Sequence, residues 1–186
     1  MTRRFIMISN TVDTSKPLSL NSLTGYGRLD VICRCISNSF FLSNRFRKDV
    51  ILQIYFDINK LILEIDGSIV RGINPDERAI AGVLKRIFNG LDYSGIRFYK
   101  GILADLLTEF QPVILDQKGS LLQSGFSKHQ SFLIGDQVGY PSGYEQIFIE
   151  LEKISLGSIE YLSSQTINIL NFRLDQEENS LFTSTQ

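Results

Sequence analysis

The chain has 186 residues, of which 43% are hydrophobic, and this composition suits one globular domain and excludes a disordered chain. Its formal net charge of −1 gives no overall positive field, so a nucleic-acid partner would have to bind local basic patches. Two cysteines are too few to form a disulfide framework. No apolar run reaches the ~20 residues of a membrane span. No secretory segment is present, so we expect a cytoplasmic protein without a membrane.

In the first half of the chain, short β-prone runs alternate with helical patterns. In chain order, we predict a strand at 3–9, a loop at 10–26, a helix at 29–40, strands at 49–56 and 61–66, and a helix at 74–88. The strand at 49–56 is apolar enough to be buried on both faces. Asn74 is placed as the N-cap of the second helix, with Pro75 as its first residue.

The second half repeats this alternation with shorter elements. We predict, in order, a strand at 96–100, a helix at 101–110, a strand at 112–116, a loop at 117–130, a strand at 131–136, a helix at 143–152 and a strand at 153–156. A final helix capped by Ser158 would bury Ile159, Leu162, Thr166, Ile169 and Leu170. Strands alternating with helices predict an α/β domain with a mainly parallel sheet and helices on both faces.

Three of the predicted strands end at small or polar turns. These strand ends lie at Leu115, Gly135 and Leu156. Because ligands of parallel sheets bind at the carboxyl ends of the strands, we expect these three positions to meet in one pocket.

The stretch GYGRLDVICRC at 25–35 combines glycines, charges and both cysteines. It lacks the third glycine of a dinucleotide fingerprint and follows a loop, not a strand. On a helix, Cys33 and Cys35 would point roughly 200° apart, and His129 is the one histidine of the chain, so no metal site is expected. The stretch is therefore interpreted as the polar mouth of a buried helix.

Asp30, Arg34 and Asn38 follow one another at four-residue steps and line one stripe of that helix, with Arg28 at its start. Two interpretations are open. Asp30 and Arg34 form an internal ion pair, or the whole cluster faces a ligand.

Four segments resemble a known family: GYGRLDVICRCISNSFFLSNRFRKDV, INPDERAI, FLIGDQVG and ISLGSIEYLSSQTINIL. Together, the GRLD motif at 27–30 and the PDER motif at 75–78 are fairly specific. The chain resembles the archaeal tRNA (pseudouridine(54)-N1)-methyltransferases of the SPOUT group from about residue 3 to residue 175. We therefore predict a single domain at 1–175 and a polar C-terminal tail at 176–186.

The resemblance implies a C-terminal trefoil knot and S-adenosylmethionine as the cofactor, with no metal. It also implies a homodimer whose substrate pocket lies near the subunit boundary. The reaction would place a methyl group on N1 of a pseudouridine in the TΨC arm of tRNA. Two alternatives stay open: a SPOUT methyltransferase acting on rRNA or another nucleoside, and a non-catalytic protein that binds S-adenosylmethionine or RNA.

The resemblance also assigns site residues. The cofactor-binding residues would be Leu115, Gly135, Ser155, Leu156, Gly157, Ile159 and Thr166. Asp30 would accept the N1 proton or serve as a structural ion-pair partner, and Arg28 would stabilise negative charge on the uracil ring or pair with a phosphate. Arg34, Asn38 and Arg78 would bind substrate.

Some residues depart from the family pattern. Gln137, Gln165 and Asn171 stand where relatives tend to carry histidines, and Thr166 stands where they often carry cysteine.

Two local basic clusters offer phosphate contacts in a chain without net positive charge. They are Arg3 with Arg4, and Arg45 with Arg47 and Lys48. The alternative is solvated surface charge.

Overall fold

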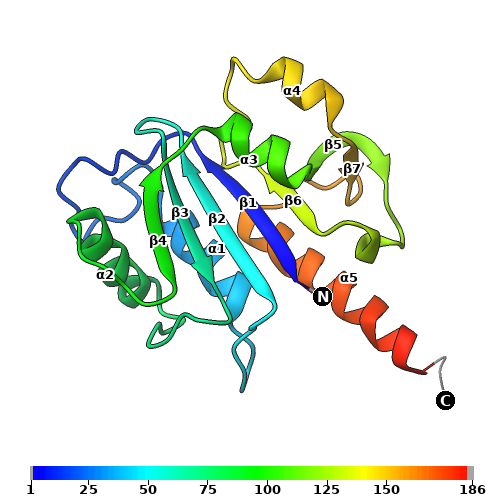
Figure 1. The fold of residues 1–186 in the computed structure, drawn as a ribbon, viewed down its shortest axis with the longest axis horizontal. Coiled ribbons are helices and arrows are strands. Elements are labelled where there is room, and N and C mark those ends of the chain that lie inside the picture. Colours follow the sequence, from blue (N-terminus) through cyan, green and yellow to red (C-terminus); the bar gives the residue numbers. More distant parts are fainter. Residues whose placement is uncertain (1, 184–186) are drawn as a thin grey trace.

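The computed structural model describes residues 2–183 of the protein. Among these residues, one sheet of seven strands has the order β4-β3-β2-β1-β6-β5-β7 (Figure 1). The strands are β1 (Arg3–Ser9), β2 (Val50–Phe56), β3 (Leu61–Asp66), β4 (Ile96–Lys100), β5 (Val113–Leu121), β6 (Ser131–Ile134) and β7 (Lys153–Ser155). The helices are α1 (Leu29–Phe40), α2 (Glu77–Phe88), α3 (Leu103–Phe110), α4 (Glu145–Glu150) and α5 (Ser163–Thr183), with a 3₁₀ turn η1 (Phe126–Lys128).

The sheet is mainly parallel, which confirms the predicted α/β class. β1 pairs in parallel with β2 and β6, and β5 pairs in parallel with β6 and β7. β3 and β4 extend the other side of the sheet through antiparallel pairing. The carboxyl ends of β1, β6, β5 and β7 therefore meet at one edge of the sheet.

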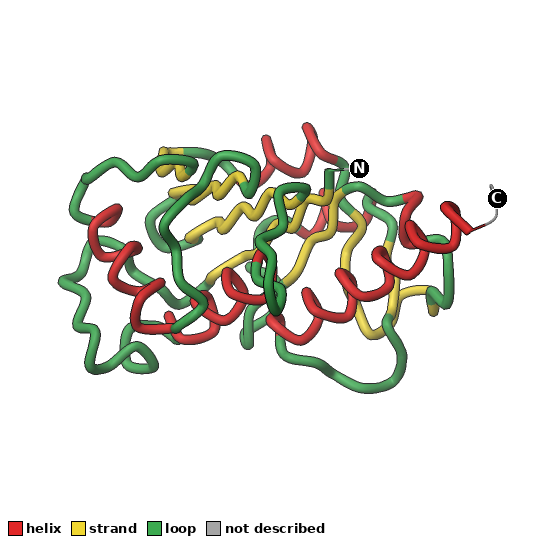
Figure 2. The backbone as a smooth tube through the Cα atoms, turned by 90° about the horizontal axis from the view of Figure 1, so that it is seen from below, coloured by secondary structure: helices red, strands yellow, loops and turns green. Residues whose placement is uncertain are grey.

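Helices cover both faces of the sheet (Figure 2). Alternate residues of the central strands face opposite sides, so Phe5 and Met7 join a core with α1, α2 and α5. Ile6 and Ile8 join a second core with α3 and α4. β2 is buried on both faces, as its apolar sequence predicts.

The start of α2 differs from the prediction. Its N-cap is Asp76 and not the predicted Asn74. The Oδ1 atom of Asp76 accepts a hydrogen bond from the Ala79 amide at 2.9 Å. An N-cap side chain must reach the amide of the second or third helical residue, and Asp76 has that spacing.

The C-terminal elements differ more. β5 continues past the predicted turn because pairing with β7 resumes at Ser120 after an irregularity. Gly119 permits this, since a Cβ there would lie 2.7 Å from the backbone of Ile154. α5 begins at Ser163, so Ser158 does not cap it, and it runs to Thr183 through residues predicted as tail. The side chains of Ile159 and Leu162, predicted as buried, are 63% and 52% exposed because they precede the helix.

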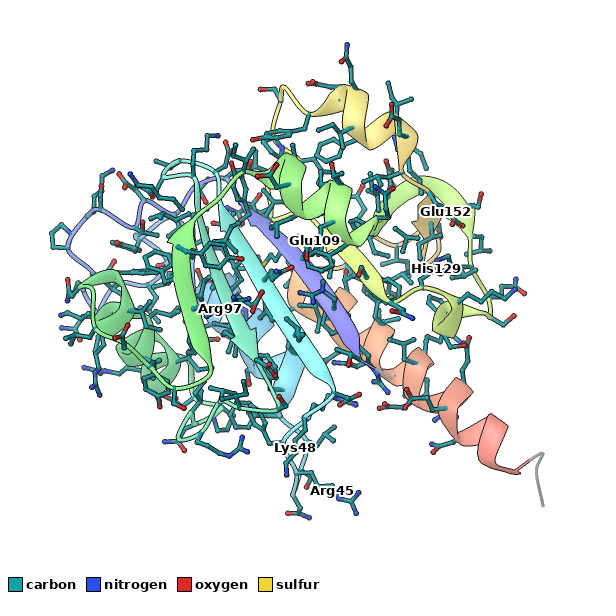
Figure 3. The ribbon with its side chains drawn as sticks, viewed as in Figure 1. Arg45, Lys48, Arg97, Glu109, His129 and Glu152 are labelled. Carbon is teal, nitrogen blue, oxygen red and sulfur yellow. The ribbon has the colours of Figure 1, made fainter. Side chains whose placement is uncertain are left out.

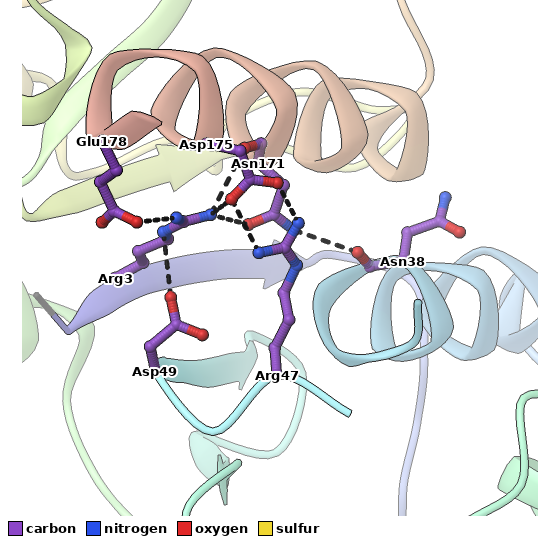
Figure 4. A network of polar contacts seen from close by, with 7 residues as sticks. All are labelled: Arg3, Asn38, Arg47, Asp49, Asn171, Asp175 and Glu178. Carbon is purple, nitrogen blue, oxygen red and sulfur yellow. Dashed lines mark hydrogen bonds and ion pairs between the residues drawn. The ribbon is translucent and has the colours of Figure 1, made fainter. Parts of the chain in front are cut away.

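A buried polar network fastens α5 to β1 and to the segment after α1 (Figure 4). Arg3 and Arg47, only 3% and 9% exposed, both contact the carboxylate of Asp175, at 2.7 and 2.9 Å. Asn171 donates to the backbone oxygen of Asn38 at 3.1 Å. Arg3 and Arg47 are therefore held by the fold, and the basic clusters noted in the sequence are divided between interior and surface.

Both cysteines are free and buried in α1. Burial raises the pKa of the Cys33 thiol to about 12, and it raises the pKa of Cys35 as well.

Within residues 2–183, no group of side chains that could hold a metal ion is present, and no helix combines the length and apolarity needed to span a bilayer.

Candidate functional site

A cleft of about 520 Å³ opens at the carboxyl ends of β5, β6 and β7. Its walls comprise residues 115–118, 134–137, 139–140 and 154–157, together with 159–163, Thr166, Arg28 and Val31. The cleft lies where parallel sheets bind ligands, and its volume is typical of a small-molecule site. The three positions predicted to converge, Leu115, Gly135 and Leu156, do line one cleft, although Leu115 lies at the irregularity within β5 and not at its end.

The residues predicted to bind cofactor all lie in the wall of this cleft. They are Leu115, Gly135, Ser155, Leu156, Gly157, Ile159 and Thr166. Their position agrees with the predicted role, and the role itself stays a prediction.

Hydrogen bonds hold the strand-end segments in place. The Tyr140 hydroxyl shares its one proton between the carbonyl oxygens of Leu115 at 2.8 Å and Leu133 at 3.1 Å, which ties β5 to β6. Burial raises the pKa of Tyr140, so its phenol stays protonated and able to donate. The Ser163 hydroxyl donates to the Gly135 carbonyl at 2.7 Å and docks the start of α5 on the same wall.

The long loop after β1 is fastened to the loop after β6. Asn10 donates from its backbone and side-chain nitrogens to the carboxylate of Asp136, at 2.6 and 2.8 Å. Gln137 donates to Thr11 at 3.1 Å, and Thr11 donates to the Gly27 carbonyl at 2.7 Å. This chain of bonds places the GRLD motif beside the cleft. No motif in the sequence marks Asn10 or Asp136, although Asn10 directly follows the buried strand β1 and Asp136 follows β6 after one residue.

The backbone of the GRLD motif has an unusual conformation. Gly27 and Arg28 both have left-handed backbones, with φ of 60° and 66°. Glycine is required at position 27, because a Cβ there would lie 2.1 Å from the Thr11 carbonyl oxygen. Arg28 adopts a conformation that few non-glycine residues populate, and it does so where its side chain lines the cleft.

Asp30 holds the Arg28 side chain by a two-pronged contact, with Nε–Oδ1 and Nη2–Oδ2 distances of 3.0 and 3.1 Å. Asp30 also accepts from Arg34 at 2.7 Å, so the predicted Asp30–Arg34 pair is present. Burial alone would raise the pKa of Asp30, but the hydrogen bonds from Arg28 and Arg34 outweigh it and lower the pKa. Asp30 is 5% exposed and is not part of the cleft wall.

The residues predicted to bind substrate lie outside the cleft. Arg34 spans Asp30 and Glu77, the latter at 3.4 Å. Asn38 donates to the Ser164 carbonyl at 2.9 Å and so links α1 to α5, whereas Arg78 is exposed on α2 and donates to Asn21 at 3.1 Å. Arg28 lines the cleft, whereas Asp30, Arg34 and Asn38 on α1 do not.

Three of the four residues that depart from the family pattern, Gln137, Gln165 and Asn171, have side-chain partners here. Gln165 accepts from the Leu162 amide at 3.0 Å at the start of α5, and Asn171 belongs to the buried network. Further cleft residues carry charge or a phenol that the sequence gave no reason to select, namely Asp116, Lys118, Glu160 and Tyr161.

The fold and the strand-end cleft define an α/β protein that binds a ligand at the carboxyl ends of its parallel strands. The fold is shared with the crystal structure of Archaeoglobus fulgidus Nep1 bound to S-adenosylhomocysteine, with a TM-score of 0.72 and 13% identity over 95% of this chain and 98% of that chain. The family model described as "Putative SAM-dependent RNA methyltransferase" matches residues 2–179, and the chain belongs to this family.

Curated relatives have more specific names. The tRNA (pseudouridine(54)-N(1))-methyltransferase of Methanococcoides burtonii is 31% identical, with 94% of this chain and 96% of the relative covered. The protein of the same name from Methanocaldococcus jannaschii is 29% identical, with 94% and 97% covered. The resemblance predicted from the sequence motifs is thereby confirmed.

Proposed function

We propose that this protein transfers a methyl group from S-adenosylmethionine to N1 of the pseudouridine at position 54 in the TΨC arm of tRNA. The observation that carries the proposal is the single cleft formed by three strand ends beside Arg28, in a chain whose relatives bear the name of this reaction. With tRNA as the substrate, the proposed place of action is the cytoplasm.

The cleft residues fit the chemistry of S-adenosylmethionine. Leu115 and Ile134 offer apolar surface to an adenosine, and Asp116 and Glu160 offer carboxylates to a molecule that carries a sulfonium and an ammonium. Gly157 has φ of 128°, so the turn after β7 presents bare backbone to the cleft. When bound, S-adenosylmethionine supplies an activated methyl group, which leaves the protein mainly the task of alignment.

Arg28 is assigned to the substrate ring. Arg28 lines the cleft, and its guanidinium is always protonated, so it cannot accept the N1 proton. It can stabilise the negative charge that the ring oxygens gain as that proton leaves. Asp30 is held ionised between two guanidinium groups behind the cleft wall, so we assign it the positioning of Arg28 and leave the proton to water.

Methyl transfer is tested with labelled S-adenosylmethionine and three RNAs. These are tRNA with pseudouridine 54, the same tRNA with uridine 54, and an rRNA fragment that contains pseudouridine. We expect label on the first RNA alone, because uridine has no N1–H to replace. Label on the rRNA fragment alone would establish the rRNA alternative. Calorimetric binding of S-adenosylmethionine without transfer to any of these RNAs would establish a binding protein.

We further propose a homodimer whose interface borders the cleft. Apolar side chains are exposed at the cleft rim and on the adjoining helix, with Ile159 63% exposed, Leu162 52% and Phe172 57%. A second copy of the chain would bury this surface and complete the substrate pocket.

Introducing a charge on this surface is expected to break the dimer. The variant Phe172→Glu should elute from size-exclusion chromatography with light scattering at half the mass of the wild-type protein and lose most methyl transfer, because a buried unpaired charge is strongly unfavourable. Ile149→Glu on α4 is the matched control, since Ile149 is 76% exposed on the opposite side of the sheet. A monomeric wild-type protein would contradict the proposal.

We also propose that the C-terminal segment is knotted. β5 lies between β6 and β7, and the chain then passes from β7 at the sheet edge to α5, which packs on α1 and contacts the end of β6 through Ser163. Single-molecule stretching by both ends tests this. A knotted chain should reach a final length shorter than that of the fully extended chain at ~3.5 Å per residue.

A further inference from the structure

A second cleft, of about 660 Å³, lies at the other end of α1 from Arg28. Its walls are the hairpin after α1, with residues 41–46 and 48, and the segment between β3 and α2, with residues 70–73 and 75. Val31 of α1 lines the first cleft and Phe41 lines the second, and these ten residues correspond to about 15 Å along the helix at 1.5 Å per residue. The methylated nucleoside therefore cannot occupy both clefts.

The hairpin is firmly anchored at its base. Its strands pair through Phe41 and Phe46, and the Leu42 amide donates to the Arg45 carbonyl at 2.9 Å. The Phe46 ring stacks on the fully buried Phe40, with ring centroids 5.2 Å apart. Arg45 lies beyond this base and extends away from the body of the protein, and the exposed Lys48 follows the base on the way to β2 (Figure 3).

The cations of this cleft are not neutralised. Arg45 and Lys48 are exposed and form no ion pair within the described part of the chain. The Arg71 guanidinium donates to the backbone carbonyls of Val70 at 2.7 Å and Ser68 at 3.0 Å. Among the residues that line the cleft, all of them in the described range, there is no aspartate or glutamate.

This pattern differs from that of the arginines that support the fold. Arg3, Arg34 and Arg47 each contact a carboxylate. In a chain with a net charge of −1, three cations left together on a rigid hairpin and its neighbouring segment form a local positive surface.

We propose that this surface, defined by Arg45, Lys48 and Arg71, is a second tRNA contact that binds the phosphate backbone away from the methylated nucleoside. The inference rests on the proposed function. Phosphate contacts supply most of the sequence-independent affinity for a nucleic acid, and a protein without net positive charge must supply them locally. Ser43 and Asn44, at the hairpin tip within the same cleft, add neutral donors for phosphate oxygens.

The double variant Arg45→Ala with Lys48→Ala tests the proposal. We measure its dissociation constant for tRNA by fluorescence anisotropy at several salt concentrations, and its KM and kcat for methyl transfer. Loss of two phosphate contacts should raise the dissociation constant and KM about tenfold or more and lower the salt slope by about 1.5–2. kcat at saturating tRNA and the affinity for S-adenosylmethionine should match the wild-type protein.

The matched control removes two exposed lysines from other elements, Lys100 at the end of β4 and Lys128 in η1. It has the same net charge as the test variant and should bind tRNA like the wild-type protein. Equal weakening in both variants, or no change in the test variant, would overturn the second contact. If the wild-type protein neither binds nor methylates tRNA, the proposed function itself fails, which is a distinct result.

Discussion

Replacing Arg28 with alanine is expected to lower kcat for methyl transfer by about 10²–10³-fold, because an oriented charge beside the reacting ring is lost. Arg28 lines the cleft, and its guanidinium is fixed by two hydrogen bonds to Asp30. Arg28→Lys keeps the charge but not the two-pronged contact, so it should recover part of the rate. Single-turnover assays measure the rate, and calorimetry with S-adenosylmethionine and a thermal melt show that the variant is folded and binds the cofactor.

The role of Asp30 is decided by combining variants. If Asp30 positions Arg28, Asp30→Asn should slow transfer in the wild-type background and have no further effect when Arg28 is already alanine. If Asp30 accepts the N1 proton, as the alternative from the sequence holds, the double variant should be slower than Arg28→Ala alone.

Replacing Asp175 with alanine is expected to destabilise the protein by about 3 kcal/mol, because the buried Arg47 loses the carboxylate it contacts, whereas Arg3 keeps Asp49 and Glu178. For a chain of this length, that loss corresponds to a fall in Tm of roughly 6–12 °C. Gln176→Ala, at the next and exposed position of α5, should change stability by less than about 0.5 kcal/mol. An unchanged Tm for Asp175→Ala would show that this carboxylate does not stabilise the packing of α5.

The same carboxylate gives stability a dependence on pH. Burial would raise the pKa of Asp175, but hydrogen bonds from Arg47 and Arg3 lower it below its ordinary value. Its contribution is therefore complete above the unfolded pKa of about 3.9 and is lost as pH falls through the folded pKa. Urea titrations should show a large difference between wild type and Asp175→Ala at pH 7 and a smaller one near pH 3.

The fold was largely predictable because most of its elements are set by local patterns. Helical spacing from Leu29 to Phe40 and the apolar runs of the central strands give α1, β1, β2 and β3 almost to the residue. The extension of β5 depends on pairing with a strand more than thirty residues later, across Gly119. No local pattern reports such a partner.

The candidate site was predictable where it depends on strand ends and not where it depends on partners. Parallel topology brings Leu115, Gly135 and Leu156 together, as the sequence predicts. Because Arg47 lies between the basic residues Arg45 and Lys48, the sequence suggests a surface cation. In the structure it pairs with Asp175, 128 residues away. A sequence pattern shows that a charge exists but not which distant side chain neutralises it.

Because both thiols are buried in α1, their chemical labelling can report the local unfolding of that helix. Cys33 and Cys35 have no exposed surface and raised pKa values, so a maleimide in solution can react only with molecules whose α1 has opened. The labelling rate then measures how often that helix detaches, without the need to engineer a dye site.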